Sequence, residues 1–285
     1  MEPVILDIAK GKYTEDAFGT SRFLMSNAKK FEKTDLSLSI SLKFVLSGIE
    51  HYRVNGKSFE LDHSKYLIVD HKSEVNVFID SDTHVRGACI YPSKDLIVDV
   101  LNNYRYSDQD LLDNHIRNDD FVLVENSYRQ CETKAGHYMS QHLPFILENI
   151  TNPELNFDNF FIGIAESLVQ DQIDIKDRLK ALDATRKTTK IELFKRVSES
   201  REFIEDNYSQ KINLEELASN ACLSKYHFLR SFKAIYKQSP YQYLLGLKLQ
   251  KAKELLQKDY SYSQINHMVG YSDVKNLRRA LSKAS

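Results

Sequence analysis

Residues 213–236 read NLEELASNACLSKYHFLRSFKAIY, and this stretch decides the fold of the C-terminal part of the chain. Its apolar residues fall three and four positions apart within two short segments, the spacing of helices that bury one face. Asn213 and Glu216 form a capping-box pattern at the first segment, and Ser224 is placed to cap the second. The sequence therefore predicts two helices joined by a tight turn, with cations on the second, which is the arrangement of a helix-turn-helix. The apolar residues are Leu214, Leu217, Ala218, Leu223, Phe228, Phe232 and Ile235.

A second pattern of the same kind follows. Residues 239–257, SPYQYLLGLKLQKAKELLQ, predict one long helix with an apolar stripe. Beyond it, Ser261 is placed to cap a short helix that Gly270 ends, and Asp273 to cap the next helix. The chain is therefore expected to contain two helix-turn-helix units joined by a long helix. The stripe consists of Tyr243, Leu244, Leu247, Ala252, Leu255 and Leu256, and Leu277 and Leu281 face inward in the last helix.

Composition limits the class of protein. A chain of 285 residues that is 42% hydrophobic suits two folded domains, and its apolar runs are too short to span a membrane. The N-terminus lacks a signal-peptide pattern, so we expect a cytoplasmic location. Three widely spaced cysteines, Cys89, Cys131 and Cys222, argue against a disulfide framework or a zinc cluster and are expected to be buried thiols.

The net charge of −1 hides an asymmetry along the chain. Residues 185–285 carry 19 Lys and Arg against 10 Asp and Glu, whereas residues 1–184 carry 20 against 30. A basic C-terminal part that coincides with a double helix-turn-helix pattern indicates a polyanionic partner.

The front of the chain has a β pattern from about 36 to 91, whereas residues 1–35 show no clear pattern. Residues 36–46 alternate apolar and polar, and Asn55-Gly56 predicts the tight type I′ turn of a hairpin. Further short strands are expected at 65–70, 75–80 and 85–91. Together these predict a small antiparallel barrel or sandwich.

The middle of the chain, 93–184, has mainly helical patterns. They cover 94–106, 108–116, 132–148 and 157–170, with a returning strand at 121–128 and a further helix at 188–207. These helices are expected either to mediate dimerisation or to cover an exposed face of the barrel, and the pattern does not separate the two. The stretch 182–190 is polar and partly basic, which favours a linker there.

The C-terminal residues resemble the DNA-binding domain of the AraC/XylS family of bacterial transcription regulators. The resemblance rests on LEELA, CLSKYHFLRSFK, SPYQYLLGLKLQKAKELL and INHMVGYSD, in that order and spacing. The front part, through FVLSGIEHYRVNGKSFEL, resembles the cupin-like sensor domain of the same family. The resemblance implies an α+β multidomain fold: a cupin-like antiparallel β-barrel with helices, then an all-α domain. The expected boundaries are a sensor domain at 1–92, a helical extension at 93–184, a linker at 185–190 and the DNA-binding domain at 191–285.

The resemblance also implies which residues contact DNA. The two recognition helices would enter successive major-groove segments, about 34 Å apart along the duplex. Arg230 is the best placed for direct readout of guanine, and Asn276 for adenine. The partners implied are double-stranded DNA, RNA polymerase, a second copy of the chain and a small-molecule effector, and the family's usual behaviour is activation. No cofactor is expected. The matching positions are Lys225, Tyr226, Leu229 and Arg230 in the first unit and Val274, Lys275, Asn276, Arg278 and Arg279 in the second.

The sequence departs from the family pattern in the second unit. Leu277 and Leu281 stand where aromatics are usual, Asn266 replaces a small residue, and the usual tail after the last helix is absent. These departures imply that the first unit carries most of the DNA recognition.

Two other functions remain open on the sequence alone. A cupin-type metalloenzyme would need a His-x-His pair, but His51 is followed two residues later by Arg53, and His63, His71 and His84 are scattered. The other alternative is a protein-interaction module with a degenerate second unit. The barrel itself either binds a small molecule or packs only its own core. Lys43, His51, Tyr52 and Arg53 lie near the expected mouth, and which of them face inward is left open.

Overall fold

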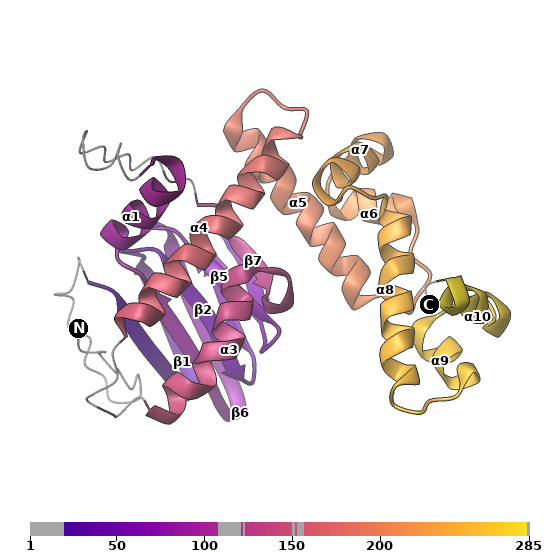
Figure 1. Ribbon diagram of the computed structural model, residues 1–285, viewed down its shortest axis with the longest axis horizontal. Coiled ribbons are helices and arrows are strands. Elements are labelled where there is room, and N and C mark those ends of the chain that lie inside the picture. Colours follow the sequence, from indigo (N-terminus) through magenta and orange to yellow (C-terminus); the bar gives the residue numbers. More distant parts are fainter. Residues whose placement is uncertain (1–19, 108–120, 122, 150–151, 153–156, 284–285) are drawn as a thin grey trace. The chain divides into compact units, whose positions relative to one another are not determined.

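The computed structural model describes residues 20–107, 121, 123–149, 152 and 157–283 (Figure 1). The chain forms two compact units, residues 1–175 and 176–285. Within the described residues, no helix combines the length and apolar character needed to cross a membrane.

The first unit is built on one antiparallel sheet that curls into a nearly closed barrel. The order of its strands is β4-β3-β6-β2-β5-β7, and β1 pairs with β6 off this path. This arrangement confirms the predicted antiparallel barrel. The strands are β1 (Arg22–Leu36), β2 (Ser41–Ser47), β3 (Glu50–Val54), β4 (Lys57–Leu61), β5 (Lys65–Val69), β6 (Glu74–Tyr91) and β7 (Asn126–Arg129).

The hairpin between β3 and β4 forms as the sequence predicts. Asn55 and Gly56 both have positive φ, 49° and 83°, as a type I′ turn requires, and Val54 pairs with Lys57 across the turn.

The strands differ from the sequence-based expectation in three places. Strands expected at 75–80 and 85–91 form one strand, β6, because β1 pairs with it on both sides of an irregularity near Ala28 and Lys30. Residues 37–40 interrupt the strand expected at 36–46. Leu36 is 60% exposed, so the apolar–polar alternation at the start of this stretch does not mark a buried face. The patternless first 35 residues contain β1, whose polar outer half gives no apolar period.

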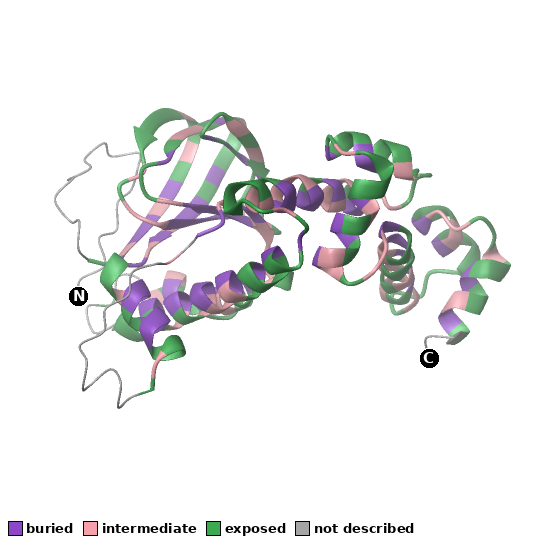
Figure 2. Cartoon of the chain, turned by 90° about the horizontal axis from the view of Figure 1, so that it is seen from above, coloured by how far each residue is buried: buried purple, intermediate pink, exposed green. Residues whose placement is uncertain are grey.

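Helices cover one face of this sheet (Figure 1). Alternate residues of the strands, such as Leu42, Phe44 and Ile90, point into a core shared with these helices. The alternation of buried and exposed residues along the strands can be followed in Figure 2. The helical predictions near 94–106, 132–148 and 157–170 are confirmed, and the region 108–116 lies outside the described residues. The helices are α1 (Lys94–Arg105), η2 (Gln130–Glu132), α3 (Lys134–Asn149) and α4 (Asp158–Lys180).

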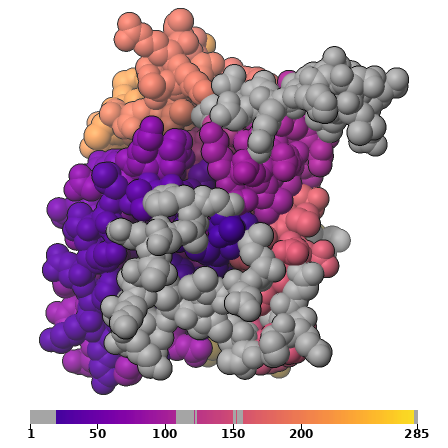
Figure 3. Space-filling view, turned by 90° about the vertical axis from the view of Figure 1, so that its left-hand side faces the viewer, coloured from indigo at the N-terminus to yellow at the C-terminus, as the bar shows by residue number. Residues whose placement is uncertain are grey.

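A hydrogen bond and shared core packing hold α1 against the start of β1. The amide of Ser93, the residue that caps α1, donates to the hydroxyl of Ser21 at 2.9 Å, just before β1. Ile97 and Leu101 of α1 share the core with Phe23 of β1. Figure 3 shows this side of the unit, with the indigo first strand beside the magenta helix.

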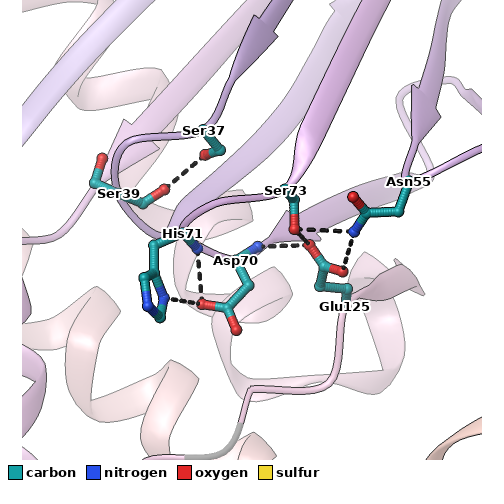
Figure 4. A network of polar contacts seen from close by, with 7 residues as sticks. All are labelled: Ser37, Ser39, Asn55, Asp70, His71, Ser73 and Glu125. Atoms are coloured by element: carbon teal, nitrogen blue, oxygen red, sulfur yellow. Dashed lines mark hydrogen bonds and ion pairs between the residues drawn. The ribbon is translucent and has the colours of Figure 1, made fainter.

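A polar network fixes the segment before β7 to the end of the barrel (Figure 4). The carboxylate of Glu125 accepts hydrogen bonds from the Asp70 amide at 2.9 Å, from Asn55 Nδ2 at 3.2 Å and from the Ser73 hydroxyl. The predicted returning strand at 121–128 is therefore real but begins only at Asn126, because the residues before it bond through side chains to loops.

The second unit is helical, as predicted. Helix α5 begins at Lys187, so most of the stretch 185–190 is helical. Its other helices form the two predicted helix-turn-helix units with a long helix between them, and the fold class expected from the sequence is confirmed. The helices are α5 (Lys187–Asp206), α6 (Leu214–Asn220), α7 (Lys225–Tyr236), α8 (Pro240–Leu256), α9 (Tyr262–Val269) and α10 (Val274–Lys283).

Candidate DNA-binding surface

The first helix-turn-helix consists of α6 and α7, and side-chain caps fix both helix starts. Asn213 Oδ1 accepts from the Glu216 amide at 2.9 Å, and the Ser224 hydroxyl accepts from the His227 amide at 3.3 Å. Between the helices Cys222 adopts the left-handed conformation, with φ of 52°. The turn is therefore tight enough to set α7 against α6 at a fixed angle.

An aromatic cluster holds α7 by its inner face. Phe228 and Phe232 are fully buried, with ring centroids 5.6 Å apart, and Phe232 lies 5.8 Å from Tyr243 of α8 in an edge-on arrangement. Both phenylalanines are thus core residues, as predicted, whereas Leu223 is only half-buried. Because the inner face is fixed, the outer face of α7 is presented to solvent.

The four predicted contact residues of the first unit all lie on α7. Tyr226 is 75% exposed, Lys225 and Arg230 are exposed, and Leu229 is half-buried beside them. Both cations are engaged in ion pairs: Lys225 Nζ lies 2.9 Å from Glu215, and a guanidinium nitrogen of Arg230 lies 2.8 Å from Asp183. These acidic partners were not predicted, because sequence spacing does not indicate that Asp183 reaches α7.

The second unit is held to α8 by its own small core. Ile265, Val269, Leu277 and Leu281 pack with Ala252, so the two leucines that replace aromatics are buried as predicted. Gly270 ends α9 with φ of 67°, and its carbonyl accepts a hydrogen bond from Lys248 Nζ at 2.5 Å.

The second unit also bears a sign of imperfect packing. Asn266 Nδ2 donates to the Tyr271 carbonyl at 3.4 Å, while its buried Oδ1 has no hydrogen-bond partner. A buried acceptor without a partner costs about 1–3 kcal/mol. The polar residue at this position therefore weakens the second unit relative to a small apolar one.

The predicted contact residues of the second unit lie on α10. Lys275, Asn276, Arg278 and Arg279 are exposed, and Val274 is half-buried. Asn276 is engaged locally, since its Nδ2 donates to the Ser272 hydroxyl and to Asp273, each at 2.9 Å. The guanidinium of Arg278 lies 4.8 Å from the Tyr262 ring centroid. Arg279 and Lys275 are the exposed cations for which no such contact is seen in the described residues.

Among the described residues, the side chains that a metalloenzyme would need do not come together. In the described part of the chain no group of three or more His, Cys, Asp or Glu has the geometry of a metal site. His51 faces Glu60 at 3.8 Å and His71 faces Asp70 at 2.8 Å, at separate places in the barrel. The cysteines are free, but the expectation that they are buried is wrong for Cys131 and Cys222, which are exposed.

Comparison with known proteins identifies the C-terminal helical domain, which contains both helix-turn-helix units. Residues 217–284 match a family model described as a helix-turn-helix domain. The MmsAB operon regulatory protein of Pseudomonas aeruginosa is 35% identical over 82 residues, which cover 28% of this chain and 27% of that protein. An uncharacterized HTH-type transcriptional regulator, YbfI of Bacillus subtilis, is 26% identical over 169 residues, covering 54% of this chain and 58% of that protein. The matches thus span about a quarter and somewhat over half of these relatives.

A solved structure of ToxT from Vibrio cholerae aligns over 92% of this chain and 93% of that one, with 11% identity and a TM-score of 0.35.

The C-terminal unit is a helix-turn-helix domain of the AraC type. The resemblance to the AraC/XylS regulators expected from the sequence is thereby confirmed.

Proposed function

We propose that this chain is a sequence-specific, DNA-binding transcription regulator that acts by binding rather than by catalysis. The observation that carries the proposal is the pair of helix-turn-helix units, each with its apolar face anchored and its polar helix face exposed. In each unit, the exposed face includes cations suited to phosphate and guanine contacts.

Helix α8 supports simultaneous use of both units. It has 17 residues, which at about 1.5 Å per residue make a rod of roughly 25 Å between them. A spacer of this size suits recognition helices that enter successive major-groove segments of one duplex face. The first unit carries most of the readout, because Asn276 is bonded within its own turn.

We further propose that the N-terminal barrel senses a small molecule, that the helices at 93–184 mediate a homodimer, and that the bound protein activates transcription with RNA polymerase. These roles follow the family that the chain resembles. A ligand regulates only if it favours one arrangement of the units over another.

The test is a mobility-shift titration of the full chain against genomic fragments at moderate salt. We expect one or a few fragments to bind far more tightly than random DNA. On the best fragment, Arg230→Ala should reduce discrimination at one base pair by about 1–3 kcal/mol, whereas Lys225→Ala should weaken all sequences alike and lower the salt slope by about 1. Lys258→Ala, at an exposed lysine after α8, is the matched control. Binding of every fragment with the affinity of random DNA would refute the proposal.

A further inference from the structure

The N-terminal barrel contains a cavity of about 330 Å³ on the face of the sheet that turns away from the helices. Strands β1, β2, β3 and β6 and the loop before β2 supply its walls. The pleat explains which residues line it: Leu42 and Phe44 point toward the helices, whereas Lys43 between them points into the cavity. Likewise Tyr52 faces the cavity, while His51 and Arg53 on either side of it are exposed. This volume is within the range of small-molecule sites.

Three cations line this cavity: Arg22, Lys33 and Lys43. Lys33 is paired with Asp35, another lining residue, at 2.5 Å, so Arg22 and Lys43 are the two to consider. Lys43 is 8% exposed, and its Nζ lies 3.9 Å from Cys89 Sγ and 5.6 Å from the centroid of the Tyr91 ring. The guanidinium of Arg22 lies 5.6 Å from the same ring. Its Nε is buried and has no hydrogen-bond partner among the described residues. The positive groups of Arg22 and Lys43 therefore both lie near the Tyr91 ring, and the Nε–H donor of Arg22 is available to a ligand.

Glu50, the other carboxylate of the lining, is engaged in hydrogen bonds with hydroxyl groups. Glu50 is 2% exposed, and its two oxygens accept from the Ser26 hydroxyl at 3.0 Å and the Tyr52 hydroxyl at 2.5 Å. Across the described part of the chain, no carboxylate oxygen lies within ion-pair distance of Lys43 Nζ. A buried charge without a close counter-ion is costly, so the cavity favours a bound anion.

The protonation states agree with this charge balance. Burial alone would lower the pKa of Lys43, but Cys89, Tyr91 and Glu50 outweigh it and raise the pKa above its usual value. Burial raises the pKa of the Cys89 thiol, although Lys43 opposes this. At neutral pH Lys43 is therefore a cation and Cys89 a neutral thiol. By formal charge, Arg22, Lys33 and Lys43 against Asp35 and Glu50 leave the lining with one net positive charge, which suits a monoanion.

Apolar side chains form another part of the lining and suit an apolar ligand body. Leu24 and Ile79 are nearly fully buried, and Phe31, Val75 and Val77 are half-buried beside them. We propose that this cavity binds a small organic monocarboxylate. The carboxylate lies between Arg22 and Lys43, and the apolar body lies against these side chains. Binding of the ligand does not depend on the proposed function. Only its role as the effector of the regulator rests on that function.

The test is isothermal titration of the full chain with 4-phenylbutanoate and octanoate as probes, each paired with its neutral amide. We expect the acids to bind at least tenfold more tightly than the amides. Lys43→Met, which keeps the stem and removes the charge, should abolish this preference. Lys30→Met is the matched control on β1, because Lys30 is 82% exposed and does not line the cavity. Arg22→Gln gives a second, independent reduction if Lys43→Met melts at a lower temperature than the wild type.

Three results would overturn the site: amides that bind as well as acids, variants at both cations that bind like the wild type, or no binding of any probe. Specific DNA binding is measured on the same preparation. Its persistence without probe binding refutes the cavity proposal alone, and its loss with intact probe binding refutes the regulator alone.

Discussion

The ion pair between Arg230 and Asp183 makes a direct prediction about DNA affinity. Asp183 lies between α4 and α5, and Arg230 is the residue best placed to read a base. The two side chains are 71% and 57% exposed and 2.8 Å apart. Asp183 competes with guanine for the Arg230 guanidinium, so we expect DNA binding to weaken or break the pair. Asp183→Asn removes that competition and should tighten binding.

The size of the effect follows from the exposure of the pair. Solvent-exposed ion pairs contribute about 0.2–1 kcal/mol. At about 1.4 kcal/mol per tenfold change, Asp183→Asn should tighten binding by about 1.4- to 5-fold. The gain should shrink as salt is added, because screening weakens the original pair.

The assay is fluorescence anisotropy with a labelled duplex of the best-bound fragment, at two salt concentrations. Asp177→Asn is the matched control, since Asp177 is an exposed aspartate of the same unit that pairs with Lys180 at 2.7 Å. In an Arg230→Ala background the effect of Asp183→Asn should disappear, which isolates the pair from general charge effects. The reasoning is wrong if both aspartate variants tighten binding equally, or if the gain survives Arg230→Ala.

Three further predictions concern the two units. Phe232→Ala should destabilise the protein by roughly 3–5 kcal/mol in urea denaturation followed by circular dichroism, because it empties the aromatic core of the first helix-turn-helix. A loss below 1 kcal/mol would contradict that role. Gly270→Ala should cost roughly 1–3 kcal/mol in the same assay, because its φ is 67° and an added Cβ would lie 1.8 Å from the Ser209 carbonyl oxygen; unchanged stability would show that the turn differs in solution. Asn276→Ala should weaken DNA binding less than Arg230→Ala in anisotropy titrations, because Asn276 already bonds to Ser272 and Asp273; an equal or larger loss would mean that the second unit reads DNA as strongly as the first.

Local signals made the helical unit predictable. Caps at Asn213, Ser224 and Ser261 and the left-handed Gly270 act within a few residues, so their positions in the sequence fix where helices begin and end. The period of three and four identified Phe228 and Phe232 as core. The β3–β4 hairpin was predictable for the same reason, because Asn55-Gly56 carries its turn conformation locally.

The sheet was less predictable, because strand pairing depends on partners distant in the chain. The polar outer half of β1 is a strand only because β6 supplies its hydrogen bonds, and β6 stays continuous past residues that resemble a turn.

The DNA-contact residues came from motif and resemblance, and they remain proposals that the structure places on exposed helix faces. What these side chains touch was decided only by tertiary structure. An ion pair such as Arg230 with Asp183, or a cavity that gathers Arg22, Lys43 and Glu50 from three strands, joins residues that no spacing in the sequence connects. The sequence by itself thus determined the two helix-turn-helix units, because caps and helical period are local. Tertiary structure alone decided the charge environment of the cavity and of the recognition helix, because electrostatic interactions depend on distance in space.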